Sequence, residues 1–155
     1  MIRTLIAAAL LLALPAAASA QTAESLSADE RTAIRQVIEK QLGAFQRDAA
    51  DEAFSYASPT IQRKFGDPAT FLQMVRTGYP QIYRPRSYAF EGMRTVRGLP
   101  AQEVFFIGPS GTGTLALYIM ERQPSGVWRI DGVRITRSPD RLSDAGPLPA
   151  GARVG

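Results

Sequence analysis

The fold is decided by the stretch Val127-Trp128-Arg129-Ile130-Asp131-Gly132-Val133-Arg134-Ile135-Thr136, whose apolar side chains change phase in the middle of a strand. Trp128 and Ile130 share one side of an extended chain, whereas Val133 and Ile135 share the other. Gly132 lies between the two pairs, and a β-bulge at or near this glycine would bring all four side chains to one face. A bulge also bends its strand, so the stretch predicts a strongly curved sheet that wraps around helices.

Strand formers dominate the sequence before this stretch, from Ser87 onward. Residues 104–107 form a dense apolar run, and residues 114–121 read as a long strand buried on both faces. Turn residues separate these runs at 108–113 and at 124–126. The glycine-rich segment 108–113 lacks the Lys-Ser or Lys-Thr pair of a phosphate-binding loop and is followed by a strand, so we interpret it as a hairpin turn. The second half therefore predicts an antiparallel meander of about four strands.

Helix signals fill the first half. Ser27 and Glu30 have the spacing of a capping box, and an apolar stripe of helical period follows, which predicts a helix over about 28–47. A short second helix is expected over 50–57. We expect an α+β fold, in which N-terminal helices pack on a curved antiparallel sheet of about four strands.

Two further helices are bracketed by the same signals. Ser58-Pro59 with Gly66, and Asp67-Pro68 with Gly78, each supply an N-cap, a first-turn proline and a terminal glycine. The two prolines of the segment from Tyr79 to Pro85 indicate a loop that leads into the strands.

Several segments together resemble a family of short secreted bacterial proteins known only as a domain of unknown function. They are Ala33–Leu42, Ala53–Pro59, Phe71–Arg76, Tyr79-Pro80, Tyr83-Arg84-Pro85 and Gly126–Ile130, and they cover roughly residues 29–137. The order of helices before a bent meander is similar to the cystatin-like cone of the nuclear transport factor 2-like (SnoaL-like) superfamily. That superfamily includes ketosteroid isomerase-like enzymes, dehydratases, polyketide cyclases and many non-catalytic members, so the resemblance does not decide the function.

The two ends of the chain differ in composition from the middle. Arg3, an apolar run of about ten residues and Ala18-Ser19-Ala20 predict a signal peptide over residues 1–20, too short in its apolar part to span a bilayer. Residues 139–155 hold almost no bulky apolar side chain and predict a disordered tail. We expect a linker over 21–27, one domain over 28–138, a periplasmic or secreted location, and no membrane insertion after signal cleavage.

Composition excludes several kinds of chemistry. The chain has no histidine and no cysteine, so a Ser-His-Asp triad, a thiolate nucleophile and the usual zinc or copper sites are ruled out. Carboxylates alone could still hold a hard cation, but no stretch has the alternating acidic spacing of a calcium loop, so we expect no metal and no cofactor. The formal net charge of +4 is dispersed along the chain, which argues against a nucleic-acid partner.

Acid–base chemistry would have to rest on carboxylates and tyrosines. If Asp131 points into the cone, burial would raise its pKa and make it a candidate general base, with Tyr56 across the cone as its partner. If it points outward, it is a surface acid, and the ambiguous phase of the bulge favours this orientation. A complete isomerase set of Asp, Tyr and a protonated acid does not align.

Binding residues are the other candidates. Tyr79, Tyr83 and Trp128 could line the mouth of a pocket, and Arg84 with Arg86 could hold an anion, although aromatic residues in a small cone also serve as its core. We favour a non-catalytic module that binds a small apolar or anionic ligand or a partner protein. The alternative is a cofactor-free lyase or isomerase that uses Asp and Tyr. Excess apolar residues in the second half predict a homodimer through the open face of the sheet.

Overall fold

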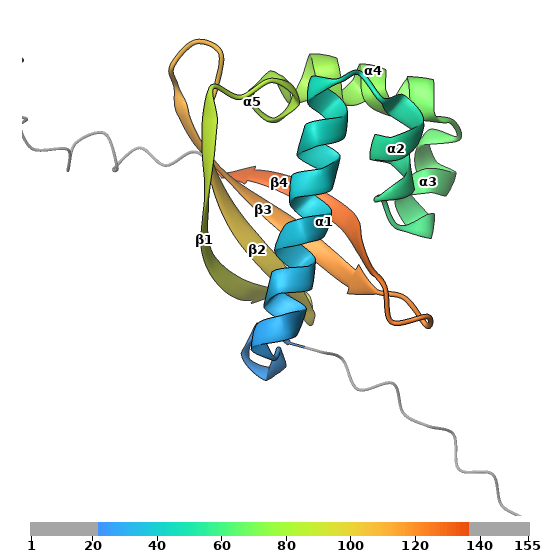
Figure 1. Cartoon of the computed structure of the whole chain (residues 1–155), viewed down its shortest axis with the longest axis vertical. Coiled ribbons are helices and arrows are strands. Elements are labelled where there is room, and N and C mark those ends of the chain that lie inside the picture. Colours follow the sequence, from blue (N-terminus) through green and yellow to red (C-terminus); the bar gives the residue numbers. More distant parts are fainter. Residues whose placement is uncertain (1–21, 137–155) are drawn as a thin grey trace, which may run out of the picture.

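The computed structural model describes residues 22–136 (Figure 1). The predicted signal peptide (1–20) and the predicted disordered tail (139–155) lie outside these residues. The elements follow in the order η1 (Ala23–Ser25), α1 (Ala28–Gln46), α2 (Ala50–Ser55), α3 (Pro59–Phe65), α4 (Pro68–Gly78), α5 (Pro80–Tyr83), β1 (Ser87–Val96), β2 (Leu99–Ile107), β3 (Gly113–Arg122) and β4 (Trp128–Thr136). The strands form one antiparallel sheet in the order β1-β2-β3-β4, so the α+β prediction is confirmed.

The helices begin where their capping residues predicted. At the start of α1 the Ser27 hydroxyl accepts a hydrogen bond from the Glu30 N–H (3.2 Å), and the Glu30 carboxylate accepts one from the Ser27 N–H (2.9 Å). The Ser58 and Asp67 side chains cap α3 and α4 by accepting hydrogen bonds from the N–H groups of Ile61 and Thr70, each before a first-turn proline. Gly66 ends α3 at φ +80°, a conformation that glycine adopts without strain.

The bulge in the last strand is present. Ile119 pairs with Gly132 whereas Met120 pairs with Ile130, so Asp131 is the extra residue of β4. The cross-strand partners of Trp128, Ile130, Val133 and Ile135 on β3 are residues 122, 120, 118 and 116, which all point to one face because strand side chains alternate. Trp128 and Ile130 are buried and the other two pack partly buried against the same core, which confirms the sequence prediction.

The core lies between α1 and the sheet, where α1 crosses one face of the strands (Figure 1). From the helix come Ile34, Ile38, Leu42 and Phe45, all at most 1% exposed. From the sheet come Val104, Phe106, Ala116, Tyr118 and Met120, which are fully buried. A second group of helices, α2 to α4, packs beside α1, where Phe54 and Phe65 contact Phe71 at ring-centroid distances of 5.4 and 5.7 Å.

Two local features differ from the sequence prediction or were not part of it. The expected loop 79–85 contains α5, because Pro80 fixes the first helical φ and Ile82 and Tyr83 are buried. The β1–β2 turn consists of Arg97 and Gly98, both at positive φ (52° and 78°), which is the conformation of a tight two-residue hairpin.

The segment expected to be a linker is packed on the domain over its described residues. Ala23 and Leu26 are buried, the Ala23 N–H donates to the Thr95 hydroxyl (3.1 Å), and the Arg31 guanidinium donates to the Ala23 carbonyl (2.7 Å). No helix within residues 22–136 has the length and apolarity needed to cross a membrane.

Candidate functional site

An open cavity of about 350 Å³ is lined by residues of the helices, of the sheet and of the β1–β2 turn. This volume falls at the lower end of the roughly 300–1,000 Å³ typical of small-molecule sites. Its walls are mostly apolar and include Phe45, Phe71, Val75 and Ile82 from the helices and Ile130 and Val133 from β4. The bulge in β4 contributes to the site, because it turns Val133 to the same face as Ile130.

Charged side chains also line the cavity, and most of them are basic. Lys64 of α3, Arg97 of the β1–β2 turn and Arg134 of β4 are exposed, and none of the three forms an ion pair with another described residue. The register of β4 turns the Arg134 side chain to the sheet face opposite Val133, so this residue borders the cavity from the edge of the sheet. The Lys64 ammonium lies 5.4 Å from the ring centroid of Phe65. Among residues 22–136, Asp131 is the only acidic residue in the lining.

Asp131 is held in place by Ser58. The Ser58 hydroxyl donates to the Asp131 carboxylate at 2.6 Å and accepts from the Ile61 N–H at 3.2 Å, so one buried hydroxyl both caps α3 and anchors the bulged residue of β4. The backbone reinforces this junction, because the Ser58 N–H donates to the Ile130 carbonyl (2.9 Å) and the Ile130 N–H to the Tyr56 carbonyl (2.9 Å). The position of Asp131 in the cavity lining is thus fixed by a strand-to-helix contact.

Tyr118 of β3 supplies part of the wall and has an unusual environment. The side chain is fully buried, and its hydroxyl has no hydrogen-bond partner among the described residues. Burial, with a smaller contribution from the nearby Tyr88, raises the pKa of Tyr118 far above its ordinary value, so the hydroxyl stays neutral. An unpartnered buried hydroxyl costs stability in the free protein.

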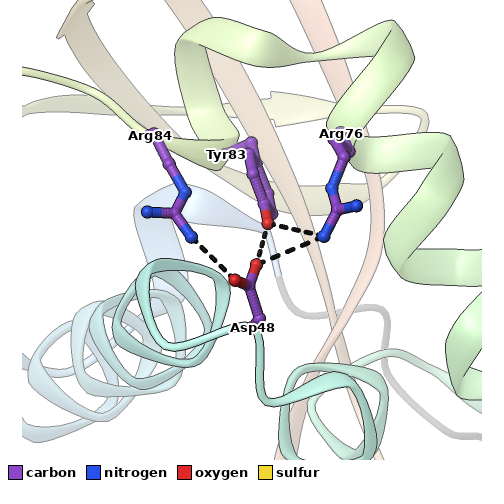
Figure 2. Close-up of polar contacts among 4 residues, drawn as sticks. All are labelled: Asp48, Arg76, Tyr83 and Arg84. Carbon is purple, nitrogen blue, oxygen red and sulfur yellow. Dashed lines mark hydrogen bonds and ion pairs between the residues drawn. The ribbon is translucent and has the colours of Figure 1, made fainter.

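A second polar cluster joins the helices outside this cavity (Figure 2). Asp48, in the turn between α1 and α2, accepts hydrogen bonds from the Tyr83 hydroxyl and from the guanidinium groups of Arg84 (2.8 Å) and Arg76 (3.4 Å). Arg76 also donates to the Tyr83 hydroxyl at 3.0 Å. Asp48 has φ +56°, a left-handed conformation that aspartate tolerates better than most residues.

The two guanidinium groups of this cluster flank the Tyr83 ring, as Figure 2 shows, at 5.3 Å (Arg76) and 5.2 Å (Arg84) from its centroid. The Asp48 carboxylate forms ion pairs with both guanidinium groups, so it already lies where an anionic ligand of this cluster would bind. The cluster therefore ties the α1–α2 turn to α4 and α5, and α4 and α5 supply Val75 and Ile82 to the cavity wall.

The candidate site residues predicted from the sequence lie at different places in the structure. Tyr79 and Asp131 line the cavity, whereas Tyr83 and Arg84 belong to the Asp48 cluster. Tyr56 is outside the lining: its hydroxyl donates to Glu52 (3.4 Å), and burial together with the Glu52 carboxylate raises its pKa.

The two remaining candidates also lie outside the lining. Trp128 is a buried core side chain. Arg86 lies beside the 108–113 turn, where its backbone N–H donates to the Ile107 carbonyl (2.8 Å). Sequence reasoning did not find Lys64, Arg97, Asp48 or Arg76, because each acquires its neighbours only through packing of distant segments.

Within residues 22–136, no three acidic side chains are grouped closely enough to hold a metal ion. In a comparison with known protein families, residues 27–142 match the family described as Domain of unknown function (DUF4864). No curated protein and no solved structure matches the chain.

Proposed function

The chain belongs to the family Domain of unknown function (DUF4864), and on that premise we propose that it is a non-catalytic module that binds a small, mainly apolar ligand. The observation that carries the proposal is the 350 Å³ cavity with its apolar walls. Apolar surface left uncovered inside a small domain is costly, and a ligand that fills it gains the same hydrophobic free energy as a core side chain.

The non-catalytic part of the proposal rests on the state of the acid–base candidates. Asp131 accepts the Ser58 hydroxyl, and Tyr56 donates to Glu52 outside the cavity lining, so these two residues are not aimed at a common reacting atom. A general base and its partner must both lie within hydrogen-bond reach of the substrate. We expect no turnover with isomerase- or dehydratase-type substrates, and measurable turnover that is abolished by Asp131→Asn would favour the lyase or isomerase alternative.

Three further properties belong to the same proposal. The helices that cover a strongly bent meander support membership of the nuclear transport factor 2-like superfamily. Export to the periplasm, with cleavage after Ala20, is supported by the signal-peptide pattern, and a periplasmic product whose mass begins at Met1 would contradict it. A homodimer through the open sheet face is supported by Leu115, which points away from the helices, and sedimentation of the protein as a monomer alone would contradict it.

Binding can be tested with N-phenyl-1-naphthylamine, a neutral apolar dye whose fluorescence rises in dry surroundings. We expect saturable binding to the wild-type domain. Val133→Phe adds a ring to the cavity wall and should weaken binding at least tenfold, because it removes the volume that the dye needs. Val127→Phe is the matched control, since Val127 is 48% exposed and outside the lining.

Equal binding by both phenylalanine variants would show that the dye binds elsewhere. No binding by the folded wild-type domain would refute the cavity as a ligand site. Near-ultraviolet circular dichroism of each variant confirms that the core is intact, because loosely packed proteins bind apolar dyes without a defined site.

A further inference from the structure

We propose that the ligand of this cavity is a neutral apolar molecule with a hydroxyl or N–H group, which donates a hydrogen bond to the side-chain amide oxygen of Gln41. This inference rests on the proposed binding function. Gln41 belongs to α1 and lines the cavity, and only 3% of its surface is exposed. Glutamine is seldom buried, so the hydrogen bonds of this side chain require an explanation.

Only one end of the Gln41 amide has a partner. Its nitrogen donates to the Ala53 carbonyl at 3.1 Å. A carbonyl oxygen can only accept, so this contact fixes which corner of the planar amide is the nitrogen. The amide oxygen accepts no hydrogen bond from any residue between 22 and 136. A buried acceptor is therefore left over in a side chain that lines the cavity.

The other buried glutamine of the domain is a useful comparison. Gln102 lies outside the lining, and both ends of its amide are used. Its nitrogen donates to the backbone carbonyls of Glu91 (3.0 Å) and Gly92 (3.1 Å). Its oxygen accepts from the Arg35 guanidinium at 3.3 Å. The same side chain is thus satisfied within the core and only partly satisfied at the cavity.

Tyr118 also lines the cavity and has an unused hydroxyl, but Gln41 is the more accessible of the two. The Tyr118 side chain is completely covered, whereas Gln41 keeps a small exposed area. A ligand can therefore contact Gln41 without first displacing the wall, and we assign the polar contact to Gln41.

The unused oxygen selects for a donor on the ligand. A ligand without a donor would cover the oxygen and leave it unpaired, which costs free energy, whereas a hydroxyl or N–H group would pair with it. A charged donor is disfavoured, because Gln41 carries no charge and the next turn of α1 presents Phe45 to the cavity. The ligand class is therefore an apolar alcohol, phenol or secondary amide.

Two ligands with the same ring system test this inference. 2-Naphthol has a hydroxyl donor, and 2-methoxynaphthalene has none. Calorimetric titration at neutral pH, where the naphthol keeps its proton, gives the affinity of each. We expect the ratio of the 2-naphthol affinity to the 2-methoxynaphthalene affinity to fall about fivefold in Gln41→Leu, because one buried hydrogen bond is lost. A loosened wall would weaken both ligands, so it would leave this ratio unchanged.

A second variant and a control use the same ratio. Gln41→Met keeps the unbranched shape of glutamine but offers only a weakly accepting sulfur, so we expect a similar fall in the ratio. Gln36→Leu is the matched control, because Gln36 is exposed on the same helix and lies outside the lining. We expect the control to have the ratio of the wild type.

Two failures are distinguishable. If Val133→Phe weakens both ligands but the ratio is the same in the wild type, Gln41→Leu and Gln41→Met, the donor inference is overturned and the binding function stands. If neither ligand binds the folded wild type, or if Val133→Phe weakens neither, the cavity is not a binding site for such ligands and the proposed function itself fails.

Discussion

Replacing Tyr118 by phenylalanine is expected to raise the free energy of unfolding. The substitution removes one oxygen atom, and that oxygen is fully buried with no hydrogen-bond partner among the described residues. In the unfolded chain the Tyr118 hydroxyl forms hydrogen bonds with water, and folding removes these bonds without replacing them. The penalty for an unpartnered buried polar group is about 1–3 kcal/mol, and the small void left by the oxygen offsets part of the gain, so we expect a net increase of about 1–2 kcal/mol.

Tyr83→Phe is the matched comparison, because Tyr83 is also buried but its hydroxyl is used. It donates to Asp48 and accepts from Arg76, so its removal leaves two charged groups with one partner fewer. Both partners are about half exposed and water replaces part of the loss, so we expect the free energy of unfolding to fall by about 1–2 kcal/mol.

Urea unfolding followed by circular dichroism measures both changes. A gain of 1 kcal/mol corresponds to a rise of about 3–6 °C in melting temperature for a domain of this size. A fall of 1 kcal/mol or more in Tyr118→Phe would refute the reasoning, because it would mean that the Tyr118 hydroxyl has a partner, such as a bound water, in the folded protein.

The same residue predicts a dependence on alkaline pH. Burial raises the pKa of Tyr118 in the folded state above its unfolded value of about 10, so the unfolded chain loses this proton first. Above about pH 10, the unfolded state therefore binds fewer protons, and the wild type should lose about 1.4 kcal/mol of stability per pH unit more than Tyr118→Phe does. Parallel stability curves of the two proteins would contradict this assignment.

Three further substitutions test the packing around the cavity. Trp128→Ala should lower the free energy of unfolding by about 3–5 kcal/mol because the ring is buried core; a loss below 1 kcal/mol would place it outside the core. Ser58→Ala removes a helix cap and the hydroxyl bound to Asp131, so it should lower the free energy of unfolding by about 2–3 kcal/mol. Asp67→Ala removes only an exposed cap and should lower it by about 1 kcal/mol; equal losses would show that the Asp131 contact does not stabilise the fold. Arg84→Gln should cost less than about 1 kcal/mol because its ion pair with Asp48 is half exposed, and a larger loss in urea unfolding would show that the cluster is more strongly coupled.

Local signals were sufficient to predict most of the fold. The capping box at Ser27, the two cap-proline starts and the phase change at Gly132 are visible in short stretches of sequence, and the structure has all of them. Gly66 ends α3 as expected, whereas Gly78 is the last residue of α4 and Tyr79 is the C-cap. The short helix α5 was missed because its formation depends on the burial of Ile82 and Tyr83 against other helices, which a segment rich in proline does not reveal.

The candidate site could be predicted only in part. Asp131 was nominated as an acid of the last strand, with an outward orientation favoured, but its hydrogen bond to Ser58 joins residues 73 positions apart and has no local signature. Asp48 meets Arg76 and Arg84 across 28 and 36 positions. Whether the space between helices and sheet is filled or hollow depends on the sum of side-chain packing, so the cavity itself could not be predicted from periodicity or spacing.

The most direct test of ligand binding is methyl chemical-shift mapping of the isotopically labelled domain during titration with N-phenyl-1-naphthylamine. We expect saturable shifts at the methyl groups of Val75, Ile82, Ile130 and Val133, which line the cavity from three different elements, with Val127 and Leu115 unmoved. Shifts at the latter two, or none at the cavity methyls under saturating dye, would contradict the proposal that this cavity binds a small apolar ligand.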